Sequence, residues 1–152
     1  TDLTDYLFSV EYWGYYELLI FANTLDVLKH ETLMVLTKEM SRRSDFYKEI
    51  PNNRLMISTM LLNVYITCIE REELIDALYF EKQLNQCFFI ETEIYERLVF
   101  QYAQNYYQYK KEGNNQSIIE MKKCIGAMKL AGSEHIAKTY EAHLKKLIEE
   151  NS

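Results

Sequence analysis

The sequence predicts an all-α fold, a TPR-like solenoid of helical hairpins with about eight helices. Only four glycines and one proline interrupt 152 residues, of which 48% are hydrophobic and 26% are charged. Such a composition is typical of long helices and argues against a disordered chain or a β-sandwich. Apolar residues also recur at intervals of three and four positions over most of the sequence. At this length we expect one domain, residues 1–152, with a substantial buried core.

The first three helices are predicted from apolar spacing and one glycine. Residues 3–13 have a hydrophobic side chain at every third or fourth position, and Gly14 can take the left-handed conformation that ends a helix. Helices over roughly residues 15–28 and 31–49 follow. Their expected inner faces are Leu18, Phe21, Ala22, Leu25 and Leu28 in the first, and Leu33, Leu36, Met40 and Tyr47 in the second.

The fourth helix is predicted to be surrounded by other helices. Pro51 marks a break before it, and Asn52 or Asn53 is the expected N-cap. Nearly every direction around the helix that follows is apolar, which is typical of a helix packed on most sides. The exceptions form a narrow polar line of Thr59, Asn63, Thr67 and Glu70.

Four more helices are expected over about residues 73–87, 93–111 and 117–131 and from residue 134 onward. Leu74, Leu78 and Leu84 should point inward in the first of these, Gly113 should end the second, and Ser133 should cap the last. Helix starts near residues 54, 93 and 134 recur at about forty residues, a period typical of helical-hairpin repeats. An irregular helical bundle is the alternative, because periodicity alone does not distinguish the two.

Charge and cysteine content limit the partners and the compartment. A net charge of −6 disfavours binding of a phosphate backbone, which needs clustered Lys and Arg. Three cysteines without a CxxC pair suit a reducing, cytoplasmic interior. No apolar run reaches the ~20 residues that span a bilayer, so we expect no membrane contact. The chain begins at Thr1 without a leader, and we expect it to be part of a longer protein.

The sequence contains none of the common catalytic motifs. HExxH, GxSxG, the P-loop pattern and GxGxxG are all missing, so we expect no enzyme activity, no cofactor and no metal. His135 and His143 are interpreted as surface or capping residues, and Cys68 and Cys87 as small core residues.

One arginine is predicted to lie on an apolar helix face. Arg43 follows Leu36 and Met40 on the same helical line, whereas Arg42 points away from it. A guanidinium on such a face needs a partner or a cavity. We therefore expect either a salt bridge to a neighbouring helix, for instance to Glu17 or Glu70, or a ligand contact.

Uncharged polar side chains also occur where a dry or mixed-charge face is expected. Asn63 and Asn23 each carry an amide that can hold the backbone of an extended peptide or form a helix–helix hydrogen bond. The line Arg97, Gln101, Gln104 and Gln108 is uncharged after its first member. This line is either an ordinary solvated face or, together with the two asparagines, part of a peptide-binding surface.

Several segments resemble a known family. The stretch YLFSVEYWGYYELLIFANTL resembles the opening of the regulatory domain in Rgg/GadR/MutR (Rgg/RopB-like) transcriptional regulators of streptococci and related Firmicutes. SRRSDFYKEIPNN, LLNVYI and IYERLVFQYAQNYYQYKKEGN are similar to later parts of that domain. The resemblance covers essentially the whole chain.

The resemblance implies a TPR-like C-terminal domain that forms a homodimer and binds a short linear signalling peptide in quorum sensing, with roles in virulence regulation. It also implies that DNA is bound by an N-terminal helix-turn-helix domain outside this chain. The implied peptide contacts on the concave surface are Asn23, Tyr47, Asn63, Tyr95 and Arg97, to which the residue pattern adds Arg43 and Gln101. The alternative is a TPR-type interaction module with a folded partner and no small peptide ligand.

Overall fold

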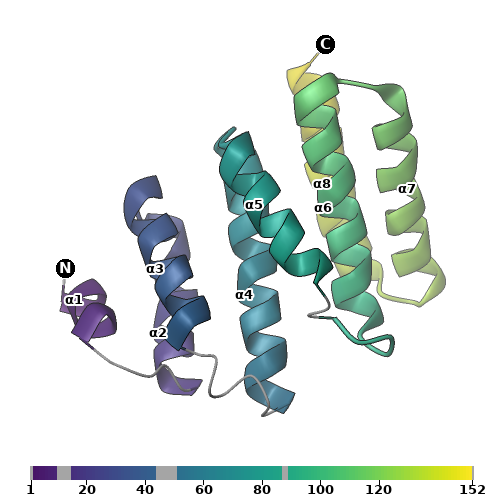
Figure 1. Ribbon diagram of the computed structural model, residues 1–152. Helices are drawn as coiled ribbons and strands as arrows, with labels where there is room; N and C mark the ends of the chain where they lie inside the picture. Colours follow the sequence, from purple (N-terminus) through teal and green to yellow (C-terminus); the bar gives the residue numbers. More distant parts are fainter. Residues whose placement is uncertain (1, 10–14, 44–50, 87–88, 152) are drawn as a thin grey trace. The chain divides into compact units, whose positions relative to one another are not determined.

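The computed structural model describes residues 2–9, 15–43, 51–86 and 89–151. Over these ranges the chain forms eight α-helices and one 3-10 helix, without a β-strand. Figure 1 shows the helices following one another as hairpins. The predicted all-α class of about eight helices is therefore confirmed.

The described residues divide into two compact units. The first consists of Thr1–Cys68 and Ile75–Ile90, and the second of Ile69–Leu74 and Glu91–Ser152. The first contains α1 (Asp2–Ser9), α2 (Tyr15–Thr24), the 3-10 helix η1 (Leu25–Val27), α3 (His30–Arg43), most of α4 (Pro51–Glu70) and α5 (Leu74–Asn85). The second contains α6 (Ile94–Glu112), α7 (Asn115–Leu130) and α8 (Glu134–Glu150).

The predicted helix over residues 15–28 is divided into α2 and η1. At the end of α2 the Thr24 hydroxyl donates a 3.0 Å hydrogen bond to the Phe21 carbonyl, and the chain then tightens into the 3-10 turn. Such tightening satisfies carbonyls that the end of an α-helix leaves without a partner. Phe21 and Leu25 are buried as expected, whereas Ala22 is exposed and does not belong to the inner face.

Helix α4 confirms the expectation of a helix packed on most sides. Of residues 53–70 only Asn63 and Glu70 are exposed, and both belong to the predicted polar line. The helix begins at Pro51, so the prediction that Asn52 or Asn53 lies before it as the N-cap is wrong. Proline suits the first turn because its missing N–H would have no partner there. Tyr65 is fully buried and its hydroxyl donates to Glu81 of α5 at 2.9 Å.

Helix α5 confirms the predicted inner face only in part: Leu84 is buried and Leu74 is half-buried as expected, but Leu78 is not. Ala77, Phe80 and Leu84 are buried, whereas Leu78 is 38% exposed and Ile75 is 88% exposed. The prediction chose leucines and gave no weight to Ala77, which packs closely because it is small. Helix α5 thus also carries apolar side chains on its outer side.

Two turns connect the three long helices of the second unit. Gly113 has a φ of 68° and donates its N–H to the Tyr109 carbonyl at 2.8 Å, which ends α6 as predicted. Asn114 then caps α7 by accepting the Ser117 N–H at 2.9 Å. Ser133 precedes α8, but its side chain makes no capping hydrogen bond, contrary to expectation. Helix α7 packs against both α6 and α8.

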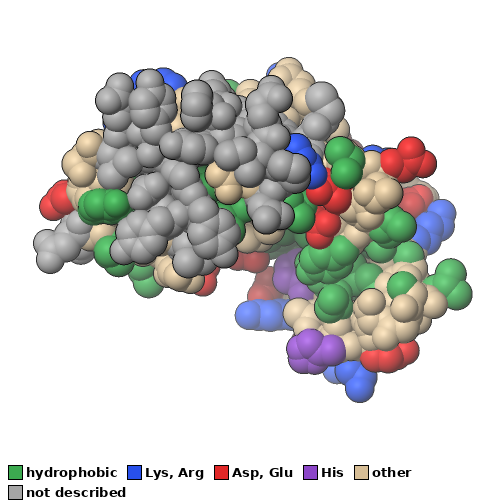
Figure 2. Space-filling view, turned by 90° about the horizontal axis from the view of Figure 1, so that it is seen from below, with side chains coloured by type: hydrophobic (Ala, Val, Ile, Leu, Met, Phe, Trp, Pro, Cys, Tyr) green, Lys and Arg blue, Asp and Glu red, His purple; other side chains and the backbone are tan. Residues whose placement is uncertain are grey.

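The described surface is mixed in character. In the view of Figure 2, acidic, basic and hydrophobic side chains are interspersed over the parts that are coloured by type. Cys68 and Cys124 are buried, and Cys87 lies outside the described residues.

Candidate functional site

Two predicted peptide-contact residues in the first unit are exposed amides. Asn23 lies near the end of α2 and Asn63 lies in the middle of α4. Among the described residues neither amide has a hydrogen-bond partner. The Asn63 backbone carbonyl accepts a 2.8 Å hydrogen bond from the Thr67 hydroxyl, and the residue is exposed to solvent. Both amides can therefore donate to and accept from an added ligand.

The Arg43 side chain is fixed by contacts with α1 and with its own helix, α3. Its guanidinium donates to the carbonyls of Leu7 at 3.1 Å and Phe8 at 2.8 Å, in the last turn of α1. Its Nε lies 2.7 Å from Glu39, one turn earlier on the same helix. These carbonyls belong to the group that a helix end leaves without intrahelical partners. This ion pair lies within α3, so the expected salt bridge to a neighbouring helix, for instance to Glu17 or Glu70, stays a prediction.

Arg42 and Arg43 together act on one carboxylate. The hydrogen bond from Arg42 to Glu39 holds the pKa of Glu39 below its usual value, and the charges of both arginines add to this effect while burial opposes it. The Arg42 side chain is 66% exposed and the Arg43 side chain only 16%, as the helical pattern predicts. Tyr47, another predicted contact, lies outside the described residues.

The predicted contacts on α6 are on two different sides of the helix. Arg97 and Gln101 are both exposed and lie one turn apart on the same side. Tyr95 precedes Arg97 by two positions, so at ~100° per residue it points the other way. Tyr95 is 46% exposed and hydrogen-bonds to Tyr140 of α8. Only Arg97 and Gln101 therefore share a surface in this unit.

A cluster of rings joins α6 to α8 on the side that carries Tyr95. The Tyr102 hydroxyl lies 2.8 Å from Nδ1 of His143, and the Tyr106 ring meets the His143 ring edge to face at 4.8 Å. Burial lowers the pKa of His143; Glu150 opposes this effect, and Lys110 and Lys146 add to it. His143 is thus a partly buried part of the helix interface, and its interpretation as a surface or capping residue is wrong.

A polar pocket of about 340 Å³ lies beside this cluster in the second unit. It was not predicted from the sequence. The sequence pattern that could have identified it is helical spacing. Tyr106 and Lys110 lie on one side of their helix, and His143, Lys146 and Glu150 lie on one side of theirs. Ammonium and carboxylate groups together can bind a charged peptide end or side chain. The charged and aromatic residues that line the pocket are Glu70, Tyr106, Lys110, His143, Lys146 and Glu150.

Comparison with known proteins shows which family the chain resembles. The family model described as "HTH-type transcriptional regulator Rgg, C-terminal domain" matches residues 1–142. Two crystal structures of the SHP pheromone receptor Rgg2 from Streptococcus dysgalactiae, one of them carrying a cysteine-to-serine substitution, are similar at a TM-score of 0.86 and 30% sequence identity. The matches cover 95% of this chain and 53% and 54% of the receptor chains.

A third similar structure is a putative transcriptional regulator from Listeria monocytogenes EGD-e, with a TM-score of 0.86 and 21% identity, covering 99% of this chain and 52% of that chain. At this identity the similarity shows the fold alone. The present chain thus spans about half the length of these proteins. No helix in the described part of the chain is long and apolar enough to cross a membrane. The chain belongs to the Rgg family of helix-turn-helix transcriptional regulators, of which it matches the C-terminal domain.

Proposed function

We propose that this chain is the peptide-sensing and dimerisation domain of a cytoplasmic transcriptional regulator, with no catalytic step. It binds a short linear signalling peptide and transmits this event to a DNA-binding domain outside the chain, as in quorum sensing. The family match and the similarity to a protein described as an SHP pheromone receptor support the peptide as the ligand class.

The observation that carries the proposal is the position of Asn63. Helix α4 is packed on nearly all sides, and an asparagine in a helix interior is less favourable than alanine. The Asn63 amide nevertheless stays exposed, without a hydrogen-bond partner among the described residues. An amide on a rigid helix can pair with both an N–H and a C=O of an extended peptide backbone.

Fluorescence polarisation with a panel of labelled short peptides, mostly apolar, tests the proposal. We expect one sequence to bind saturably and Asn63→Ala to weaken it about tenfold, since one or two hydrogen bonds are lost. The thermal midpoint should not change, because the Asn63 amide bonds to no other described residue. Asn85→Ala, which removes an exposed amide at the end of α5, is the matched control. Flat titrations from a folded chain would contradict peptide sensing.

One observation favours the second candidate, an interaction module with a folded partner. The outer side of α5 exposes Ile75 (88%), Tyr79 (44%) and Leu78 (38%) at helical spacing. Exposed apolar side chains grouped in this way are typical of protein contacts. Flat peptide titrations together with loss of a protein partner in Ile75→Ser would support this second function.

A further inference from the structure

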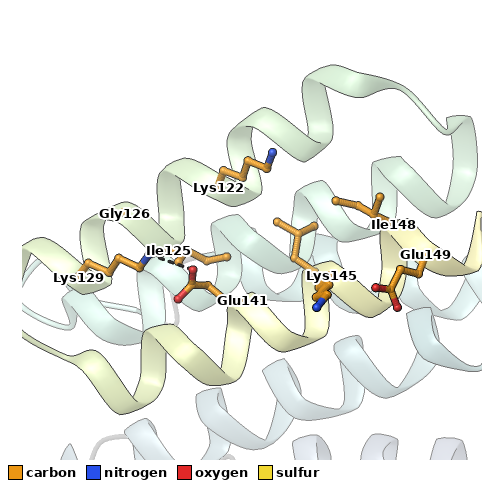
Figure 3. Close-up of a pocket in the computed structure, with 9 residues that line it drawn as sticks. Lys122, Ile125, Gly126, Lys129, Glu141, Lys145, Ile148 and Glu149 are labelled. Carbon is orange, nitrogen blue, oxygen red and sulfur yellow. Dashed lines mark hydrogen bonds and ion pairs between the residues drawn. The ribbon is translucent and has the colours of Figure 1, made fainter. Parts of the chain in front are cut away.

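A groove between α7 and α8 has no part in the peptide proposal. It has a volume of about 560 Å³, within the range of small-molecule sites, roughly 300–1,000 Å³. Ile125 of α7 and Leu144 of α8, each 4% exposed, form its apolar floor, and Ile148 is 37% exposed beside them. Figure 3 shows the Ile125 and Ile148 side chains between the two helices.

Gly126 keeps this groove open. It lies in the interior of α7, where glycine weakens a helix relative to alanine. A Cβ at Gly126 would meet nothing within 4 Å, so packing among the described residues does not require a glycine here. A glycine in such a place is suited to the close approach of another molecule.

The charges around the groove favour an anion. Lys122 of α7 and Lys145 of α8 flank it from opposite sides, and neither makes an ion pair with a residue that the structure describes. Lys129 and Glu141 pair with each other at 2.9 Å and join the two helices across the groove. Three lysines and two glutamates line the groove, which gives it a net positive charge, whereas the chain carries −6. Each of the two remaining ammonium groups can bind a carboxylate.

The dimensions define the apolar part of the ligand. The lining extends over residues 122–129 and 141–149, which at ~1.5 Å per residue is roughly 10–12 Å of helix. A linear hydrocarbon chain of roughly eight to ten carbons has this length, given C–C bonds of ~1.5 Å. The stems of the lysines can cover its sides while their charged ends stay in water.

We propose that the α7–α8 groove binds a linear aliphatic carboxylate. The hydrocarbon chain lies on Ile125, Leu144 and Ile148, and the carboxylate lies beside Lys122 and Lys145. This site is separate from the exposed amides of α2, α4 and α6, and its existence does not depend on the peptide.

Isothermal titration calorimetry of the whole chain with decanoate, below its micelle concentration, tests the site. We expect one saturable site per chain. Hexanoate should bind on the order of a hundredfold more weakly, because each buried methylene contributes roughly fourfold. Decyltrimethylammonium, which has the same chain length and the opposite charge, should not bind. Equal binding of the carboxylate and the cation would overturn the assignment.

Variants separate the groove from adventitious binding. Lys122→Gln combined with Lys145→Gln should weaken decanoate at least about tenfold. Lys123→Gln combined with Lys138→Gln removes two exposed charges from the same helices outside the groove and should leave the affinity unchanged. Gly126→Leu should fill the groove and abolish binding without lowering the thermal midpoint. Equal losses in both lysine pairs would overturn the proposal.

A second copy of the chain is the competing occupant. Light scattering coupled to gel filtration distinguishes it: the proposal expects the same mass for the original chain and Gly126→Leu. No decanoate binding by the original chain, together with dissociation of a dimer in Gly126→Leu, would overturn the proposal and assign the groove to self-association.

Discussion

Arg43 shows how a single charged side chain on an apolar helix face is accommodated. The helical pattern correctly places it inward and Arg42 outward. Its actual use, as a donor to two carbonyls at the end of α1, could not be predicted from the sequence. Backbone carbonyls have no residue signature, and the approach of α1 to α3 depends on the folded chain. Among the predicted contact residues, Arg43 thus has a clear structural role.

We predict that Arg43→Ala lowers the free energy of unfolding by about 1–3 kcal/mol, because the part-buried hydrogen bond to the Leu7 carbonyl and the exposed one to the Phe8 carbonyl are lost. Arg43→Lys should recover only part of this loss, since an ammonium cannot reproduce the fork of the guanidinium. Arg42→Ala, at a largely exposed side chain, should change stability by about 0.5 kcal/mol or less. Urea unfolding measures all three variants. Similar losses for Arg42→Ala and Arg43→Ala would contradict this role.

Two glycines give opposite expectations for the same substitution. Gly126 has ordinary helical backbone angles and open space at its Cβ position, so Gly126→Ala should stabilise the chain by roughly 0.5–1 kcal/mol. Gly113 has a φ of 68°, so Gly113→Ala should destabilise it by roughly 1–2 kcal/mol. Thermal or urea unfolding of both variants checks the signs. A loss of stability in Gly126→Ala would mean that the groove is narrower than the structure shows.

At the scale of helices, the sequence predicts well where a helix forms and less well which of its faces is buried. Long periodic segments identify α6, α7 and α8 within a few residues of their bounds, whereas the predicted end of the third helix at residue 49 lies outside the described residues. In α5 the burial of Leu84 was predicted correctly, but Leu78 was chosen in place of Ala77 because alanine carries a weaker hydrophobic signal than leucine. The pairing of Tyr102 with His143 was not predictable either. These residues are 41 positions apart, and their contact depends on how α6 and α8 align along each other. Sequence periodicity therefore indicates which face of a helix is buried, but the residues that contact each other across two helices depend on how the helices pack.

The contact between α6 and α8 should make stability depend on pH. Burial lowers the pKa of His143 in the folded chain, so the unfolded chain binds more protons in this range. Stability from this group is complete above the unfolded value of about 6.5 and decreases as the pH falls towards the lower folded value. A neutral imidazole can also accept a hydrogen bond from the Tyr102 hydroxyl at Nδ1, whereas the imidazolium carries a proton on both nitrogens and cannot.

Urea unfolding at about pH 7.5 and about pH 5.5, on either side of the unfolded value, measures this dependence. We expect the original chain to lose stability at the lower pH and His143→Gln to lose less. His135→Gln, which removes an exposed histidine from the same helix, should behave like the original chain. The carboxylate of Glu150 and the ammonium groups of Lys110 and Lys146 are present in every variant, so their effects cancel in the comparison. Identical pH responses of the two histidine variants would contradict the prediction.

At the scale of the whole chain, the fold class and the family are predicted better than the binding contacts. The sequence alone predicts the all-α class, and the family resemblance is confirmed by a model match over residues 1–142. The predicted contact set is divided by the structure: Asn23 and Asn63 are exposed in one compact unit, and Arg97 and Gln101 in the other. A helical pattern shows which side chains point outward, but it does not show what they bind.

The charge of −6 predicts that the chain by itself does not bind duplex DNA. Affinity for DNA comes largely from cations that displace condensed counterions, and an acidic chain with interspersed charges offers few such contacts. Fluorescence anisotropy with a labelled duplex should stay flat from roughly 50 to 200 mM salt. If binding appears at the lowest salt and disappears as salt rises, a local basic surface outweighs the net charge. DNA recognition would then not depend on a separate helix-turn-helix domain alone.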